Sequence, residues 1–428
     1  MPRPPVDTVP RRRWGMGALL GSGILISFLD RINLAAAAPF LQRDLHLTPV
    51  QIGKLLSVMF IPYAVLQIPI GLLVDRWGAT WMGRIGAFLW TAASALTALA
   101  GGYGGIMAAR LVLGVAEAPS FPTVAKATGH WFPRHERARA TAIFDASAKF
   151  SSVIGVPLLG WVIAKWGWRW GFGITSAISF VYFIAYTALY RDPSNDRHLS
   201  AAEHAYILEG GGMAEGTSGA GSLAMLGYLL CQTKVWGLAL GFGAYGYAFY
   251  LFLNWLPDYM VRTGGMTNLK TAAVPWAVAT VTDAVVGGWL IDRLIARGVD
   301  ETRVRKSVLV VGMLLGLAII GATQTANPRW ALFWLSVSLG GLAAAAPVGW
   351  SLPSLIAPRG GTGTVSGIMN LAVNAMGIAA PYATGYIIQE TGSFKWAFLV
   401  AAAVLAVGIF AFIFLLGRIE PLPGPALG

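Results

Sequence analysis

The chain has 428 residues, of which 56% are hydrophobic and only 12% are charged. Soluble domains carry about 25% charged residues, so this composition excludes an ordinary soluble protein and indicates a membrane protein. The formal net charge of +12 would suit nucleic-acid binding only if the basic residues were gathered in one patch.

Twelve apolar segments are predicted to cross the membrane as helices, because a hydrocarbon core about 30 Å thick requires roughly 20 apolar residues per helix. The first six lie near residues 14–40, 50–73, 82–101, 105–128, 139–163 and 168–190. The second six lie near residues 227–260, 269–291, 306–325, 330–357, 363–389 and 394–417. The alternating pattern of a membrane β-barrel is absent. We therefore predict an all-α membrane protein with two pseudo-symmetric halves of six helices.

The first segment also resembles a signal peptide, because three arginines at 11–13 precede an apolar stretch. Asp30 and Arg31 interrupt that stretch and eleven more spans follow, which favours an uncleaved first helix. With the N-terminus inside, eighteen Lys or Arg residues fall on cytoplasmic segments and seven on external ones. This positive-inside distribution predicts that both termini are cytoplasmic, and it makes nucleic acid an improbable partner.

Two motifs occur once in each half of the chain. "GLLVDRWGATWMGR" and "GGWLIDRLIARG" both place Asp-Arg four residues after a glycine, at Asp75-Arg76 and at Asp292-Arg293. "GWRWGF" and "SFKWAF" repeat at a similar offset, about half the chain, and one internal duplication explains both pairs.

The segment 191–222 is polar and rich in Gly and Ser, as expected of a cytoplasmic linker. We therefore predict an N-terminal six-helix half over 1–190, a linker over 191–222 and a C-terminal six-helix half over 223–428. A repeat of this kind is typical of transporters that bind their substrate between the halves.

The loop motif at 71–84 resembles that of the major facilitator superfamily. A closer resemblance is to its anion:cation symporter branch, and within it to bacterial galactonate/glucarate-type sugar-acid transporters. The stretches that carry it span essentially the whole chain: "FLDRINLAAAAP", "RLVLGVAEAPSFPT", "HWFPRHERARA", "FYLFLNWLPDYM" and "GIMNLAVNAMGIAAPYATGYI". The resemblance implies a proton-coupled symporter in which helices 1 and 4 face each other, with Asp30 and Glu117 as the proton sites.

A charged residue in the middle of a membrane span costs about 2.5–3.5 kcal/mol and is therefore expected to serve function, and seven charged residues of the predicted spans are singled out on this ground. They are Asp30, Arg31, Arg110, Glu117, Asp145, Lys149 and Asp283. Arg110 and Glu117 are seven residues apart and share one helix face, whereas the adjacent Asp30 and Arg31 point about 100° apart. If the two helices face each other, Asp30 would lie near Arg110, or Glu117 near Arg31.

These residue types predict distinct roles. A buried carboxylate gains or loses a proton as its surroundings change, so Asp30 and Glu117 are predicted to couple protons. Arginine stays charged and grips a carboxylate with its planar fork, so Arg31 and Arg110 are predicted to bind an anionic substrate. The alternative is that these four residues form a structural ion-pair network.

Helix 5 departs from the family pattern, in which a neutral polar residue is usual at the position of Lys149. Asp145 and Lys149 are four residues apart, which suits a salt bridge within the helix. Alternatively, Lys149 is a second cation for a dianionic substrate. Asp283 has no explanation at this level.

Further residues are predicted to contact the substrate: Tyr63, Tyr245, Asn254, Trp350, Ser351, Asn370 and Asn374. The alternative is helix–helix hydrogen bonding for the polar ones and packing for the aromatic ones. Asp75, Arg76, Asp292 and Arg293 are predicted to latch the cytoplasmic side and so to gate it.

No metal-ligand spacing, nucleotide-binding loop or catalytic triad stands out, so we predict neither an enzyme nor a cofactor. The leading hypothesis is a monomeric symporter of the bacterial inner membrane that imports a sugar acid (an aldonate, aldarate or uronate) with protons by alternating access. An aromatic or dicarboxylic acid carrier, or an anion exchanger of the same fold, is the alternative. A carrier of neutral sugars or drugs ranks third, because Arg31 argues against it.

Overall fold

The computed structural model describes residues 10–212, 223–264, 269–325, 327–358 and 361–424, and all regular structure within them is helical. The first part of the chain forms α1 (Arg12–Asp44), α2 (Pro49–Val58), α3 (Phe60–Val65), α4 (Gln67–Leu99), α5 (Tyr103–Glu117), α6 (Ser120–Trp131), α7 (Arg134–Trp166) and α8 (Trp168–Leu189). After η2 (Pro193–Asn195) and α9 (Ala201–Glu209) come α10 (Leu223–Leu230), α11 (Thr233–Gly264), η3 (Leu269–Ala272), α12 (Ala273–Thr282) and η4 (Asp283–Leu290). The last elements are α13 (Ile291–Ala296), α14 (Glu301–Gly316), η5 (Leu317–Thr323), α15 (Pro328–Ile356), α16 (Thr362–Thr391), α17 (Phe394–Phe410) and η6 (Ala411–Leu415).

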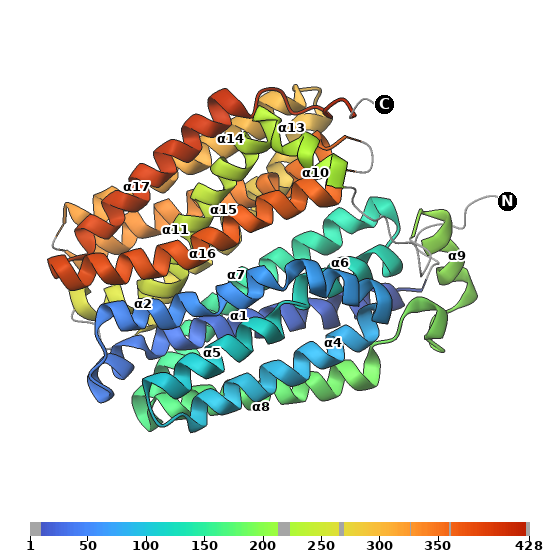
Figure 1. Cartoon of the computed structure of the whole chain (residues 1–428). Helices are drawn as coiled ribbons and strands as arrows, with labels where there is room; N and C mark the ends of the chain where they lie inside the picture. The colour runs from blue at the N-terminus through green and yellow to red at the C-terminus, as the bar shows by residue number, and fades with distance from the viewer. Residues whose placement is uncertain (1–9, 213–222, 265–268, 326, 359–360, 425–428) are drawn as a thin grey trace.

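The helices form two bundles that lie side by side (Figure 1). Helices α1 to α8 pack mainly among themselves, and so do the elements from α10 to η6. We call them the first and the second bundle. Helix α9 lies at one end of the molecule (Figure 1), which we call the α9 end, and the opposite end is the far end.

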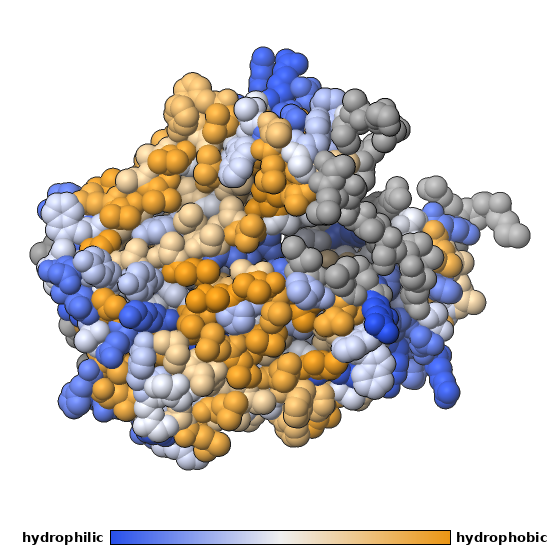
Figure 2. Space-filling model, viewed as in Figure 1, coloured by the Kyte–Doolittle hydropathy of each residue, from blue (hydrophilic) through white to orange (hydrophobic). Residues whose placement is uncertain are grey.

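The expectation of an all-helical membrane protein is confirmed. Among the described residues, eight helices are long and apolar enough to cross a membrane. Large apolar side chains face outward along them, for example Val181 and Phe414, which are 65% and 66% exposed. Figure 2 shows such side chains over the middle of the visible face, with hydrophilic ones gathered toward the helix ends.

The other four predicted spans are also helical, but their helices are interrupted or short. The segment predicted at 50–73 is broken at Met59 and Leu66, and the one at 105–128 is broken between Glu117 and Ser120. Gly78 has φ 77° and ψ 169°, a conformation that favours glycine, and it divides α4 into two legs. Continuous apolar composition predicts a span, but it does not reveal where the backbone leaves the helical path.

The two bundles meet closely at the far end, where α2 packs against α16. A Cβ atom on Gly53 would lie 2.7 Å from the carbonyl oxygen of Pro381, and one on Gly385 would lie 2.4 Å from that of Pro49. Only glycine permits both approaches, so small residues set the distance between the bundles, as they do between membrane helices in general.

Polar side chains also join the bundles at the far end. Gln42 of α1 donates to Oδ1 of the fully buried Asp258 of α11 at 3.2 Å. Arg262, one turn further along α11, lies 2.8 Å from Oδ2 of Asp258 and donates to the side chain of Gln42. Together with the α2–α16 contact, this network closes the far end.

Toward the α9 end the bundles diverge. Within the described residues, the substantial contacts between bundles involve α1, α2, α3 and α7 on one side and α11, η3, α12, η4 and α16 on the other. Figure 2 shows a hollow between the bundles on the α9 side, with hydrophilic side chains at its base. The structure is therefore closed at the far end.

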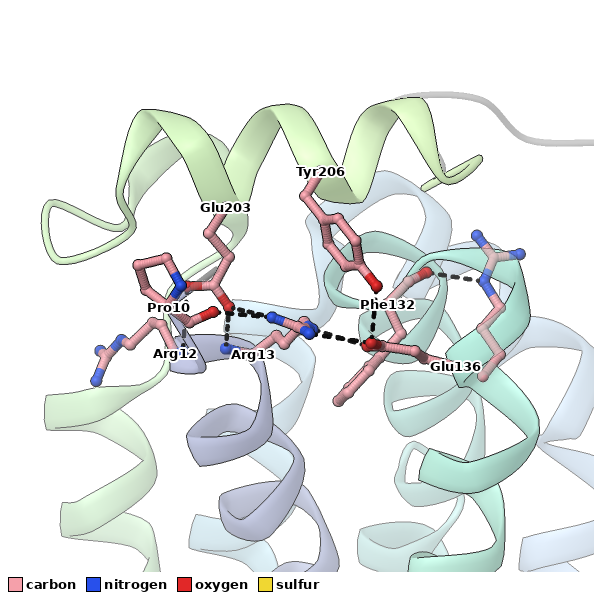
Figure 3. A network of polar contacts seen from close by, with 8 residues as sticks. Pro10, Arg12, Arg13, Phe132, Glu136, Glu203 and Tyr206 are labelled. Carbon is pink, nitrogen blue, oxygen red and sulfur yellow. Dashed lines mark hydrogen bonds and ion pairs between the residues drawn. The ribbon is translucent and has the colours of Figure 1, made fainter. Parts of the chain in front are cut away.

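Helix α9 is attached to the first bundle through a buried ion network (Figure 3). Glu203 of α9 accepts hydrogen bonds from the backbone N–H groups of Arg12 and Arg13, the first residues of α1, at 3.1 and 3.0 Å. The guanidinium of Arg13 contacts Glu203 at 3.0 Å and Glu136 of α7 at 2.7 Å. Glu203 thus caps a helix that has no capping side chain of its own.

Candidate functional site

A buried ion pair joins two helices of the first bundle at mid-height. Nε of Arg31 on α1 donates to Oε2 of Glu117, the last residue of α5, at 2.5 Å. Arg31 is 3% exposed and Glu117 is fully buried. The sequence left two pairings open between the first and fourth predicted spans, Asp30 with Arg110 or Arg31 with Glu117. The structure forms the second one through its side chains.

This pair is only partly satisfied. Nη2 of Arg31 and Oε1 of Glu117 are buried and make no well-formed hydrogen bond among the described residues, although the hydroxyls of Tyr63 and Tyr250 lie near the guanidinium and that of Ser27 lies near the carboxylate. Buried polar groups are nearly always hydrogen-bonded, so open donors and acceptors at one spot point to a ligand, a proton or a water. The rings of Phe28, Tyr63 and Phe60 surround the guanidinium, with centroids 4.8, 5.3 and 5.9 Å from its carbon.

The neighbouring Asp30 faces the interior of the first bundle. Its Oδ1 accepts a hydrogen bond from Ser94 of α4 at 2.7 Å, and its Oδ2 accepts one from Ser179 of α8 at 3.1 Å. Two hydroxyl groups can bond to the protonated acid as well as to the carboxylate. Asp30 and Arg31 thus point to different helices, as their 100° separation predicts.

Arg110 lies near both Asp30 and Glu117 but forms no salt bridge with either carboxylate among the described residues. Its Nη1 donates to the backbone carbonyl of Asp30 at 3.5 Å, and its Nη2 lies 2.9 Å from the sulfur of Met59. The side chain is 1% exposed, so its charge is held inside the bundle beside Glu117.

A second charged cluster crosses the boundary between the bundles. Nζ of Lys149 on α7 lies 2.6 Å from Oδ2 of Asp145 and 2.8 Å from Oδ2 of Asp283, the first residue of η4. We call these three residues the lysine triad. The predicted salt bridge between Asp145 and Lys149, both on α7, is present. Asp283, which the sequence left unexplained, contacts the same ammonium from the second bundle.

A row of aromatic rings connects the two clusters. Phe242, Tyr245, Phe249 and Tyr250 of α11 follow one another with centroids 4.8, 5.8 and 5.5 Å apart, and Tyr250 meets Phe60 at 4.7 Å. Tyr245 interacts electrostatically with all three members of the lysine triad, and Tyr250 does so with Arg31 and Glu117. The row therefore runs along α11 from one cluster to the other.

Comparisons with known proteins identify the family. The family model of the Major Facilitator Superfamily matches residues 20–381. The chain belongs to the major facilitator superfamily. This transporter is 36% identical over 412 residues to an uncharacterised transporter of Bacillus subtilis named YybO, with 95% of each chain covered. It is 30% identical to a D-galactonate transporter of Escherichia coli, with 96% of this chain and 97% of the relative covered.

A third relative is the probable galactarate/D-glucarate transporter GarP of Escherichia coli, which is 31% identical with 92% of each chain covered. The fold matches a solved bacterial homologue of the human lysosomal transporter Spinster, with a TM-score of 0.70 at 18% identity and 95% of each chain covered. The predictions of the family, of its relation to galactonate/glucarate transporters and of a protein that is not an enzyme are confirmed. The chain is a multi-pass membrane transporter.

The polar candidates of the transporter's second bundle mostly have partners on their own helices. Nδ2 of Asn374 donates to Oδ1 of Asn370 at 3.3 Å, and Asn254 donates to the carbonyl of Tyr250 at 2.8 Å. Ser351 donates to the carbonyl of Val348 and accepts from Arg305 of α14 at 3.0 Å. Their roles toward a substrate stay predictions, as do those of all candidate site residues.

The aromatic candidates occupy different positions. Tyr63 is buried beneath Arg31, and Tyr245 is part of the aromatic row. Trp350 of α15 is 39% exposed and meets Phe242 edge-on at 4.9 Å. Trp350 thus extends the aromatic row beyond the lysine triad.

The predicted latches are only partly visible. The side chains of Asp75 and Asp292 lie outside the described part of the structure. Arg76 is exposed, and the guanidinium of Arg293 lies over the ring of Trp289, 5.0 Å from its centroid. The gating role of these four residues stays a prediction.

Several residues of the site escaped sequence reasoning. Phe242 and Phe249 lie three residues before and four residues after the predicted Tyr245, which places all three on one helix face, and this spacing could have revealed the row. Ser94 and Ser179, the partners of Asp30, carry no local signal because they lie on α4 and α8.

Proposed function

We propose that this transporter imports a sugar acid together with protons, by alternating access of a site between the two bundles. The observation that carries the proposal is the buried Arg31–Glu117 pair with an open guanidinium nitrogen and an open carboxylate oxygen. The printed functions of the galactonate and galactarate/glucarate relatives support the same class of cargo.

The geometry suggests how proton and anion are coupled. While Glu117 is ionised, it neutralises Arg31, and a substrate carboxylate would have to compete with it. A proton on Glu117 removes this competitor, so the guanidinium fork becomes free to bind a substrate carboxylate through two hydrogen bonds. Loss of the proton on the other side restores the internal pair and releases the cargo.

Asp30 supplies a second proton site in this scheme. It adjoins Arg31 in sequence, and two serine hydroxyls hold its carboxylate. Protonation of Asp30 would leave the positive charges of Arg31 and Arg110 less compensated and would favour entry of an anion. Arg110 acts through its bond to the Asp30 backbone as well as through its charge.

Alternating access requires two bodies that rock against each other. We assign these bodies to residues 1–190 and 223–428, joined by the linker 191–222, in a bacterial inner membrane. The excess of basic residues on one side supports a cytoplasmic α9 end and cytoplasmic termini. In this orientation the present structure, closed at its far end, would be the inward-facing state of a monomeric carrier.

A carrier of aromatic acids is the second candidate. The aromatic row between Phe60 and Trp350 favours it, because stacked rings would accept a flat aromatic cargo. The same row also suits the C–H faces of a sugar acid, and the sugar-acid relatives give that cargo priority.

The test is the thermal stability of the purified protein with a panel of ligands at pH of about 5.5 and 7.5. The panel holds aldonates, aldarates, uronates, aromatic acids and neutral sugars. A ligand present at about 100 times its Kd stabilises by about 2.7 kcal/mol, which such a scan resolves. Stabilisation by sugar acids, stronger at the lower pH, supports the proposal. Stabilisation by neutral sugars alone contradicts it, and a response to aromatic acids alone favours the second candidate.

A further inference from the structure

The lysine triad bears on the charge of the cargo, an inference that rests on the proposed function. Lys149 is 2% exposed and already contacts two carboxylates at 2.6 and 2.8 Å. While both carboxylates are ionised, one ammonium against two carboxylates gives the triad a net charge of −1. Lys149 is therefore not a free cation that awaits the second carboxylate of a dianionic substrate.

The triad also offers acceptors to a neutral cargo group. Oδ1 of Asp283 is buried and has no hydrogen-bond partner in the described part of the chain, while the side chain of Asp145 is 25% exposed. A hydroxyl group can donate to such oxygens, whereas an ionised carboxylate has no proton to donate. The triad thus favours a hydroxyl over a carboxylate at its end of the site.

The spacing of the clusters suits the two ends of one cargo molecule. Tyr250 meets Phe60, whose ring lies near the Arg31 guanidinium, and Tyr245 is within electrostatic range of all three residues of the triad. The two tyrosines are five residues apart on one helix, which corresponds to about 7.5 Å along its axis. A sugar acid whose carboxylate binds Arg31 would therefore direct its opposite end toward the triad.

We infer that the lysine triad selects sugar acids with a single carboxylate, aldonates, over aldarates, which carry a carboxylate at both ends. Galactonate and galactarate form a matched pair, because they differ only in the group at the end that would approach the triad. Repulsion between the second carboxylate and the triad is expected to weaken galactarate binding roughly tenfold to a hundredfold, given the effective dielectric near 20 of protein sites.

The experiment measures the Kd of both acids for the purified full-length protein by titration calorimetry at pH about 8, where both carboxyl groups of galactarate and those of the triad are ionised. The variants Asp145→Asn and Asp283→Asn each remove one negative charge from the triad. Each is expected to raise galactarate affinity relative to galactonate about tenfold. Asp192→Asn, a matched change outside the site, should leave the ratio unchanged.

The outcomes separate the inference from the function on which it rests. Galactarate binding to the unaltered protein as tightly as galactonate would overturn the inference and leave the proposed function standing. A preference that stays the same in both triad variants would also overturn it. If neither acid binds, the proposed function is overturned, and the inference with it. If Asp283→Asn fails to fold, the partly exposed Asp145 still provides the test.

Discussion

The two charged clusters at mid-height differ in which parts of the molecule they join. Arg31 and Glu117 both belong to the first bundle, so their pair can persist while the bundles move as rigid bodies. The lysine triad joins α7 of the first bundle to η4 of the second, so its contact with Asp283 exists only while these two elements touch. A cluster inside one bundle can keep its ligand and protons while the bundles move. A cluster between the bundles forms or breaks when the bundles move relative to each other.

The clusters also differ in their charge balance. Glu117 gives Arg31 one counter-ion and leaves polar atoms open on both sides, while Lys149 has two counter-ions. Loss of one negative charge therefore frees a cation in the first cluster but only neutralises the second. The following predictions use that difference, from the largest expected effect to the smallest.

Glu117→Gln should abolish gradient-driven accumulation, because the amide cannot bind and release a proton, while counterflow exchange of substrate persists. Uptake and exchange in proteoliposomes with an imposed pH gradient measure the two activities. Asp145→Asn, which removes a carboxylate from the other cluster, should keep accumulation. Accumulation that survives in the Glu117 variant would show that the proton is coupled elsewhere.

Arg31→Lys should weaken sugar-acid binding by about tenfold to a hundredfold, because a single ammonium replaces a planar fork that can form two parallel hydrogen bonds. Arg110→Lys is the comparison variant, since Arg110 contacts a backbone carbonyl and a sulfur atom in place of a carboxylate. Calorimetric Kd values measure both, and equal losses would mean that Arg31 has no special role in docking the anion.

Asp283→Asn should shift the protein toward states that are open at the far end, because it weakens a charged bond between the bundles. Such bonds contribute about 1.5–3 kcal/mol, and Lys149 keeps Asp145, so we expect a shift of about tenfold in the equilibrium. Asp145→Asn removes a partner that lies on the same helix as Lys149, so it should shift the equilibrium between closed and open states less.

Distances between spin labels at the exposed far-end positions 43 and 395, in a chain with Cys231 replaced by serine, measure this shift. An equal response of the two variants would mean that the bond between the bundles does not hold the closed state.

The smallest expected effect is on stability and comes from a substitution of Asp192, which follows α8 and lies outside the predicted spans. Burial acts to raise the pKa of Asp192, but interactions with His130 and with the Thr80 hydroxyl at 2.9 Å outweigh it, so this pKa is lowered. A lowered pKa in the folded state means that the ionised group stabilises the fold above the unfolded value near 4. This stabilisation is lost as the pH falls through the folded value.

Asp192→Asn should therefore reduce the free energy of unfolding by about 1 kcal/mol at pH 7, and by progressively less below about pH 4. Thermal unfolding of both proteins across this pH range tests it. A difference that grows toward acid pH would contradict the assignment.

The sequence by itself determined the class of fold and the inventory of charges. Apolar segments of membrane length predict helices wherever they occur, and intramembrane Asp, Glu, Arg and Lys are conspicuous because their burial is costly. The bond between Asp145 and Lys149 was also predictable, because residues four apart on a helix always meet on one face.

Only the tertiary structure decided which helices share their charges. Lys149 and Asp283 are 134 residues apart, and Glu203 caps a helix that begins 191 residues earlier. Neither contact leaves a periodic signal, because each joins elements that are far apart in the sequence. The pairing of Arg31 with Glu117, one of two predicted options, was settled in the same way, because the arrangement of α1 and α5 in the bundle brings these two side chains together.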